Sequence, residues 1–151
     1  MELRMKARQA GLGVILIRID QLDPEAHERV SSSGVVKRPT IECAAYQLAH
    51  DVSALADLPD QVMLRVPPSP TVTFDEIISG WAGLKDQNQD IFIKHADFFR
   101  RWVQELPVIV LAVGVDGRHV SCYWRETGEA ESGIIEELKG HLEKCRDHFS
   151  S

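Results

Sequence analysis

The sequence has few cysteines and no long apolar run, and both absences limit what the protein can be. Its three cysteines, Cys43, Cys122 and Cys145, lie far apart and never form a CxxC pair, which excludes a disulfide framework and a zinc knuckle. We expect them to be buried, reduced thiols. The apolar run from Val14 to Ile19 is too short for a membrane span or a signal-peptide core. These features predict a soluble cytoplasmic protein.

Positive charge is also scarce. The chain has 17 lysines and arginines against 23 aspartates and glutamates, a formal net charge of −6. The whole molecule is therefore not attracted to nucleic-acid backbones or anionic lipid, although a local basic patch would leave nucleic-acid contact open. An acidic surface favours a basic protein partner instead. A length of 151 residues supports one hydrophobic core, so we expect a single domain over residues 1–151.

No complete catalytic, metal or phosphate signature is present. Gly11 and Gly13 form a GxG, but Leu16 occupies the position of the third glycine of a phosphate loop. Cys43 and His50 lie about two turns apart on an expected helix, roughly 10 Å, which is too far for direct proton transfer. His119 and Ser121 share one face of an expected strand, yet a polar solvent-facing strand explains them equally well. We therefore expect no catalytic residues, metal or cofactor, and the sequence leans away from an enzyme.

The segment from Pro107 to Glu126 is the most informative stretch. Val108 to Val113 are all apolar, which predicts a strand covered on both faces at the centre of the sheet. Asp116 and Gly117 supply the two positive-φ positions of a tight turn. In the following strand, one face is expected in the core and the other is expected to be exposed; the exposed face carries His119, Ser121 and Tyr123.

The remaining elements follow from periodicity and capping residues. Strands are expected at Leu3–Arg8, Val14–Ile19 and Val62–Val66; helices begin at Thr40, Thr73, about His95 and Ser132; Asp20–Pro39 and Lys85–Asp90 are polar connections. The predicted order is ββαβααββα, ending in a hairpin and a C-terminal helix. This order indicates an α+β or α/β fold with helices packed on a mixed sheet.

Besides the polar connections Asp20–Pro39 and Lys85–Asp90, two groups of residues are candidates for partner binding. The first is the hairpin face with His119, Ser121 and Tyr123. The second is a basic group formed by Lys94, Arg100 and Arg101. Asp97 lies three and four residues before the two arginines, so a salt-bridged solvent face is the competing interpretation of the second group.

Residues 91–124, IFIKHADFFRRWVQELPVIVLAVGVDGRHVSCYW, resemble part of a known family. They are similar to the C-terminal half of a family of small prokaryotic domains of unknown function in the restriction-endonuclease-like (PD-(D/E)XK) superfamily, often found in phage-defence systems. The match covers under a quarter of the chain. It rests on an aromatic helix end, a proline-led apolar strand, an acidic turn and a closing Tyr-Trp pair: Phe99, Trp102, Pro107, Val108–Val113, Asp116, Tyr123 and Trp124.

The resemblance implies an upstream active site, with an aspartate followed on the next strand by a glutamate or glutamine, one residue and a lysine. The nearest counterpart is Asp60 followed by Met63, Leu64 and Arg65, which lacks the second metal-binding side chain and the lysine. The resemblance thus implies a non-catalytic relative with a nuclease-like fold. We expect a prokaryotic or phage-encoded interaction module in a defence, immunity or mobile-element context that binds a protein partner.

Two alternatives remain open at this stage. One is an active magnesium-dependent nuclease with migrated ligands, drawn from Asp60, Asp75 and Glu76, with Asp57 as a substitute for Asp60. The other is a subunit of a larger assembly, which would expose apolar surface on the isolated chain. The sequence does not identify the partner, the oligomeric state or the pathway.

Overall fold

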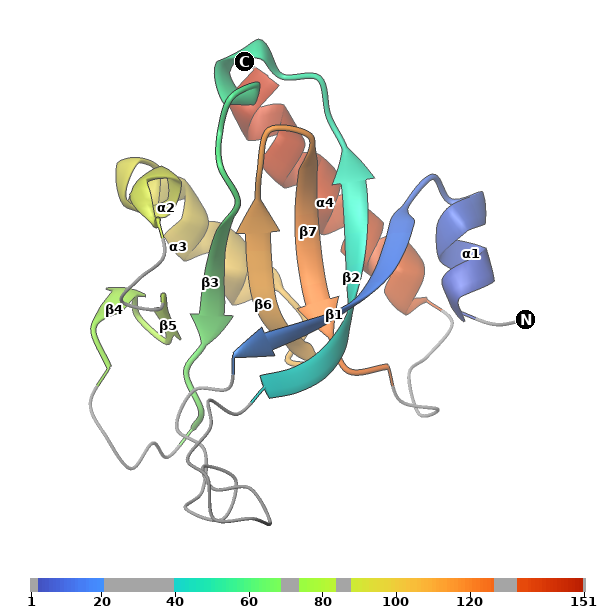
Figure 1. The fold of residues 1–151 in the computed structure, drawn as a ribbon, viewed down its shortest axis with the longest axis horizontal. Helices are drawn as coiled ribbons and strands as arrows, with labels where there is room; N and C mark the ends of the chain where they lie inside the picture. Colours follow the sequence, from blue (N-terminus) through green and yellow to red (C-terminus); the bar gives the residue numbers. More distant parts are fainter. Residues whose placement is uncertain (1–2, 21–39, 69–73, 84–87, 127–132, 151) are drawn as a thin grey trace, which may run out of the picture.

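The structure is a computed structural model that describes residues 3–20, 40–68, 74–83, 88–126 and 133–150. Its strands form one sheet of seven in the described part of the chain (Figure 1). In sheet order they are β1 (Gly13–Asp20), β2 (Thr40–Ala49), β7 (His119–Trp124), β6 (Val110–Val115), β3 (Gln61–Arg65), β5 (Trp81–Ala82) and β4 (Glu76–Ile78). Every neighbouring pair is antiparallel. The fold is therefore α+β, and the predictions of a mixed sheet and of α/β as the alternative class were wrong.

The helices are α1 (Leu3–Gln9), α2 (Asp90–Lys94), α3 (Ala96–Glu105) and α4 (Ile134–Ser150), with a short 3₁₀ helix η2 (Ser53–Leu55). Helix α4 contacts β7, β2, α3 and α1, so it lies across β2 and β7. Trp102 Nε1 donates a 2.8 Å hydrogen bond to the main-chain oxygen of His141 and ties α3 to α4. The predicted helices at His95–Leu106 and after Ser132 are confirmed, although Ser132 itself lies outside the described residues.

The prediction that the apolar strand lies at the centre is confirmed. Strand β6 is the fourth of the seven, and Val110, Val113 and Val115 are at most 2% exposed. The strand begins at Val110 rather than Val108, whose side chain is 84% exposed. Two residues of the apolar run thus belong to the connection from α3.

The turn from β6 to β7 occurs where it was predicted, but by a different mechanism. Gly117 does not have a positive φ; among the described glycines only Gly11 and Gly80 do. The Asp116 carboxylate instead accepts hydrogen bonds from the main-chain N–H groups of Arg118 and His119, at 2.7 and 2.8 Å. A Cβ on Gly117 would lie 2.5 Å from the main-chain oxygen of Ala56, so this position needs glycine for space rather than for its φ.

The predicted helix from Thr40 is wrong, because these residues form the ten-residue strand β2. Ala44, Tyr46 and Leu48 pack on the side of the helices, while Cys43 and Ala45 belong to a cluster on the other side. Both faces of β2 are buried at its centre, so the sequence shows no clean alternation of polar and apolar residues.

Two further assignments were wrong. Leu3–Arg8 forms helix α1 rather than a strand. The helix predicted from Thr73 is replaced by the short strands β4 and β5, joined at Gly80 with a φ of 85°. That positive φ is unfavourable in a helix and suits a tight turn between strands.

The other predicted elements agree with the structure where it describes them. Val14–Ile19 lies within β1 and Val62–Val66 largely coincides with β3. The connection Asp20–Pro39 lies outside the described residues except at Asp20, which ends β1, and Lys85–Asp90 is described only from Asn88, with Asp90 beginning α2.

The sheet has two different faces. The helical face packs against α3 and α4 and holds the main core. The other face, which we call the open face, carries a second cluster that includes no helical residue: Cys43, Ala45, Leu64, Ala82, Ala112 and Tyr123. In Figure 1, α3 and α4 lie behind the sheet, and no described helix lies in front of it. The side chains of β7 that were predicted to share a face, His119, Ser121 and Tyr123, point to the open face.

Candidate functional site

Polar side chains gather on the open face near the turn between β6 and β7. We call this group the hairpin-end cluster; it consists of Gln47, Asp60, Asp116, His119, Ser121 and Tyr123. The sheet register brings them together from four strands. Ser121 lies opposite Gln47 on β2 and opposite Gly114 on β6. Gln61 lies opposite Val115, so Asp60 and Asp116, the next residues outward, lie side by side at the end of the β3–β6 ladder.

Tyr123 forms the floor of this cluster. Its side chain is 4% exposed and shares a hydrogen bond with the side chain of Ser121, which also accepts a 3.3 Å hydrogen bond from Gln47 Nε2. A Cβ on Gly114 would lie 2.7 Å from Tyr123 Oη, so the glycine makes room for the phenol. Burial raises the pKa of Tyr123 above its ordinary value, and the carboxylates of Asp60 and Asp116 raise it further. The phenol therefore stays neutral.

At the rim of the cluster, the carboxylate of Asp116 acts on that of Asp60. Partial burial raises the pKa of Asp60, and the negative charge of Asp116 raises it further. Asp60 is exposed and Asp116 is partly exposed, so both can meet a solvent-borne partner. Two like charges held together at an accessible edge would be stabilised by a cation placed between them.

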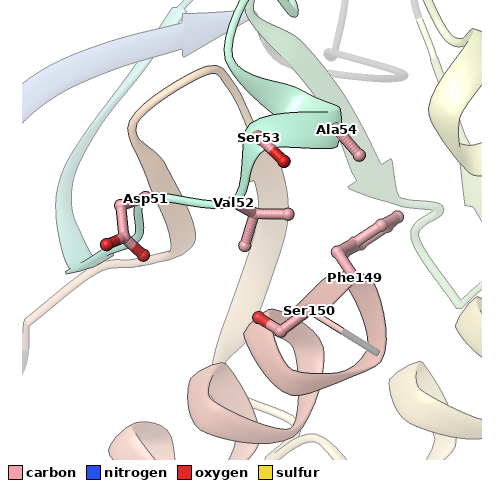
Figure 2. Close-up of a pocket in the computed structure, with 6 residues that line it drawn as sticks. All are labelled: Asp51, Val52, Ser53, Ala54, Phe149 and Ser150. Carbon is pink, nitrogen blue, oxygen red and sulfur yellow. The ribbon is translucent and has the colours of Figure 1, made fainter.

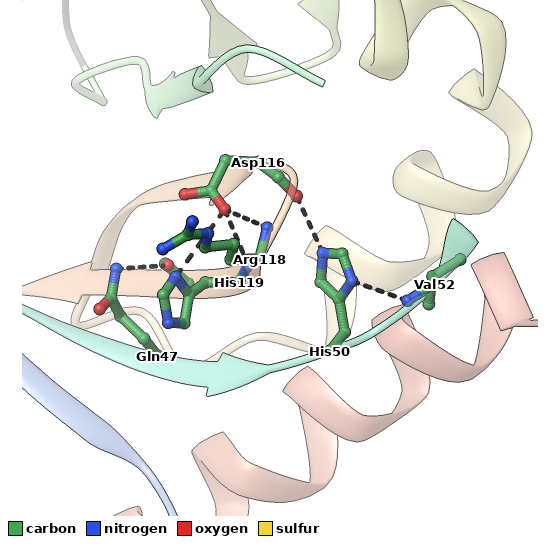
Figure 3. A network of polar contacts seen from close by, with 7 residues as sticks. Gln47, His50, Val52, Asp116, Arg118 and His119 are labelled. Carbon is green, nitrogen blue, oxygen red and sulfur yellow. Dashed lines mark hydrogen bonds and ion pairs between the residues drawn. The ribbon is translucent and has the colours of Figure 1, made fainter. Parts of the chain in front are cut away.

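His50 fixes the position of Asp116 (Figure 3). Its Nε2 lies 2.8 Å from the main-chain oxygen of Asp116, and its Nδ1 accepts a 3.1 Å hydrogen bond from the N–H of Val52. This pattern fits the tautomer with the proton on Nε2, which donates to the carbonyl. The ring thus links the connection after β2 to the turn between β6 and β7.

In the part of the chain that the structure describes, neither His119 nor Ser121 belongs to an assembled nucleophile. His119 Nδ1 lies 3.8 Å from Asp116 Oδ1, but no hydrogen bond joins His119 to Ser121 among the described contacts. Ser121 is 3% exposed and is held by Gln47 and Tyr123. A catalytic serine needs its base within hydrogen-bonding reach. The expected solvent exposure of this face is wrong for Ser121 and Tyr123 and holds only partly for His119.

The ligands expected for a nuclease are not brought together. Asp60 precedes β3, whereas Asp75 and Glu76 lie at the start of β4, with β5 between the two strands. Glu76 pairs with Ala82, which lies opposite Leu64. Leu64 is about 13 Å along β3 from Asp60 at the usual rise per residue. Within the described ranges, no three acidic, histidine or cysteine side chains are placed to hold a metal ion.

The basic group lies on the other side of the sheet. Lys94 ends α2, and Arg100 and Arg101 lie on α3, which packs against the helical face. All three side chains are exposed. Arg100 is paired with Asp97 at 3.1 Å, as the competing interpretation predicted. The two groups of binding candidates therefore belong to separate surfaces.

The cysteines are free and buried, as predicted. Burial raises the pKa of Cys122 to about 12 and also raises the pKa values of Cys43 and Cys145. A thiol that stays protonated is a poor nucleophile and a poor metal ligand.

A pocket of about 420 Å³ lies between the connection after β2 and the end of α4 (Figure 2). Its lining residues are Asp51, Val52, Ser53, Ala54, Phe149 and Ser150. Asp51 is the one ionisable side chain among them. His50 precedes Asp51 in the chain and contacts Asp116, so the pocket lies next to the hairpin-end cluster. Asp51 adds a further carboxylate to this end of the molecule.

Sequence reasoning missed the roles of Gln47, His50 and Asp116 in this site. Asp116 was recognised only as a turn residue, and Gln47 and His50 were placed on a helix. Nothing local in the sequence indicates that β3 and β6 are neighbours, and that pairing is what places Asp60 beside Asp116.

Comparison of the chain with protein-family models, with curated proteins and with solved structures finds no match in any of the three. None of the described helices is long and apolar enough to cross a membrane.

Proposed function

We propose that this protein is a non-catalytic interaction module that binds a basic protein partner at the hairpin end of its sheet. The observation that carries the proposal is the Asp60–Asp116 pair, two carboxylates held side by side where solvent reaches them. A lysine or arginine of the partner that enters between them relieves their repulsion and forms charge-assisted hydrogen bonds.

The surroundings of this pair support the same choice of partner. Asp51 and Asp57 are exposed in the connection that follows β2. The turn between β6 and β7 packs on that connection at Gly117 and Ala56. Together with a net charge of −6, these carboxylates would steer a basic surface toward this end of the sheet.

The absence of an assembled catalytic group in the described residues supports a binding role over an enzymatic one. Among the described contacts, His119 and Ser121 share no hydrogen bond, and the acids proposed for a nuclease lie at the starts of different strands, β3 and β4. We further propose that the module acts in a phage-defence context, and this part of the proposal rests on the resemblance of residues 91–124 alone.

The test uses two charge-matched double variants. Asp60→Asn with Asp116→Asn removes the pair, and the amide oxygen at position 116 can still accept the hydrogen bonds of the turn. Asp97→Asn with Glu136→Gln removes two exposed charges elsewhere. A partner captured by the tagged chain from a lysate of its source organism is purified, and its affinity is titrated at low and high salt.

We expect a basic partner whose affinity falls about tenfold or more in the first double variant and by far less in the second. High salt should weaken binding of the wild type. A captured partner without excess positive charge, or equal affinities for the two double variants, would contradict the proposal. Hydrolysis of DNA or RNA with magnesium or manganese that Asp60→Ala abolishes would replace it with the nuclease alternative.

A further inference from the structure

The two edges of the sheet differ in how well they are protected. Strand β4 has three residues and an irregular register against β5. Strand β1 has eight residues, all paired with β2 without a register shift. It contains no proline and no lysine. Short strands, irregularities, prolines and lysines are the devices by which soluble proteins prevent edge-to-edge pairing. Edge β4 uses two of them, whereas β1 uses none of these four and carries only one exposed charge among its described side chains, Arg18.

Strand β1 exposes apolar side chains on both faces of the sheet, besides the exposed Arg18. Ile15 is 45% exposed and Leu16 is 58% exposed. Since they are consecutive, one points to the open face and the other to the helical face. Their neighbours on β2 are Ala45 and Ala44, which are too small to cover them. In the described part of the chain, no strand pairs with the outer edge of β1.

We propose that the outer edge of β1 pairs antiparallel with β1 of a second copy of this chain. The two seven-stranded sheets then form one continuous sheet about a two-fold axis. Such a contact satisfies the edge hydrogen-bonding groups of both copies with one self-complementary surface. The proposal does not depend on the proposed function, because Asp60 and Asp116 lie at the ends of β3 and β6, well away from this edge.

The sequence of β1 narrows the position of the axis, and we place it at Leu16. Main-chain groups that face the free edge belong to alternate residues, so residues of like parity pair. An axis at Leu16 sets Leu16 opposite Leu16 of the second copy and Ile15 opposite Ile17. Arg18 then faces Val14, so no like charges meet. An axis at Arg18 would place two guanidinium groups opposite each other, which is destabilising.

Charge favours a second copy over a charged peptide. Strand β1 carries one positive and one negative residue, Arg18 and Asp20, and Arg18 lies opposite Glu42 on β2. The edge therefore attracts neither an acidic nor a basic segment strongly. Strand β6 lies three places from β1, about 14 Å at the usual strand spacing. In the dimer, the acidic ends are thus several Debye lengths apart, and their repulsion is screened at physiological salt.

The primary experiment is sedimentation equilibrium of the full chain. A dimer joined by one strand pair buries less surface than a standard interface, so we expect weak association. The measurement therefore extends to about 1 mM protein. We expect the mass to rise to that of a dimer. Leu16→Lys places two ammonium groups at the axis and should restore the monomer. Ile93→Lys is the matched control, since Ile93 is 60% exposed on α2 and should leave the dimer intact.

A cross-linking variant tests the register. Directly opposed residues of an antiparallel pair have Cα atoms about 4.5–5.5 Å apart, within the range of a disulfide. Under oxidation, Leu16→Cys should form a covalent dimer, and Ile93→Cys should not. A monomer over the whole concentration range, a dimer that survives Leu16→Lys, or failure of Leu16→Cys to cross-link would each overturn the proposal.

Discussion

Tyr46 Oη donates a 2.5 Å hydrogen bond to Glu126 Oε2, across eighty positions of sequence. The other oxygen of the same carboxylate accepts a 2.8 Å hydrogen bond from Arg4 Nε. Tyr46 is fully buried and makes an edge contact with the ring of Trp124. One carboxylate just after β7 thus connects the middle of β2 to helix α1, which explains how a seven-residue helix is held against the sheet.

Removing this hydroxyl should destabilise the protein. Tyr46→Phe leaves the ring in place but deprives the carboxylate of a buried donor, and we expect a loss of about 2 kcal/mol in the free energy of unfolding. Urea denaturation measures it. Arg100→Gln, which breaks an exposed ion pair, serves as the control and should change the free energy by less than about 0.5 kcal/mol. Equal effects of the two substitutions would contradict this role for Tyr46.

Gly114 should not tolerate a side chain. A Cβ there would lie 2.7 Å from Tyr123 Oη and 3.1 Å from Cε2 of the same ring. We expect Gly114→Ala to cost about 1–3 kcal/mol through overpacking. In Gly13→Ala, on β1, the nearest atoms lie 3.9 Å away, so this variant should be neutral or slightly stabilising. Thermal unfolding of the two variants tests whether Gly114 makes room for Tyr123. Equal melting temperatures would argue against that role.

Asp60 should make the protein less stable as the pH rises. The pKa of its carboxyl is raised by partial burial and by Asp116. The folded state therefore holds this proton more tightly than the unfolded state does. The associated stability is present below the ordinary pKa of aspartate and is lost as the pH rises through the folded value. Asp60→Asn should be more stable than the wild type at pH 7, with a smaller gain at acid pH. Denaturation at both pH values checks this, and a less stable variant at pH 7 would contradict it.

The contact between His95 and His148 predicts the opposite pH dependence of stability, in the pH range where histidine titrates. His95 Nδ1 lies 3.0 Å from His148 Nε2, and Phe98 stacks on the His148 ring. Burial, followed by His95 and Arg101, lowers the pKa of His148. The lowered pKa means that neutral His148 contributes to the stability of the folded protein. That stability is present above the ordinary pKa of histidine, about 6.5, and is lost as the pH falls through the pKa of the folded state.

Unfolding free energies at pH 7.5 and 5.5 test this expectation. The loss on acidification should be smaller in His148→Gln than in the wild type, while both proteins retain native circular dichroism. His141, whose pKa burial also lowers, should keep part of the effect. An identical loss in the two proteins would show that His148 does not carry it.

The thiols should be inert until the protein unfolds. Cys43 is 3% exposed, and Cys122 and Cys145 are fully buried. A colourless thiol reagent that releases a chromophore should find no reactive group in the native protein at pH 8 and three after denaturation. Rapid labelling of one native thiol would most directly question the burial of Cys43 on the open face.

The sequence by itself determined the elements whose signal is local. The uninterrupted apolar run of β6 indicated a central strand, and the spacing of Ile135, Leu138 and Leu142 indicated the last helix. The alternation in β7 assigned His119, Ser121 and Tyr123 to one face. Each of these patterns is set by residues a few positions apart, so no knowledge of the neighbouring strands was needed.

Only the tertiary structure decided the state of β2 and the composition of the site. Ile41, Ala45 and Leu48 fit a helical spacing, but β1 and β7 flank this segment and bury both of its faces as a strand. Asp60 lies beside Asp116 because β3 pairs with β6, and that pairing joins segments some fifty residues apart. Such contacts depend on how distant apolar surfaces are buried together, which no local pattern of residues specifies.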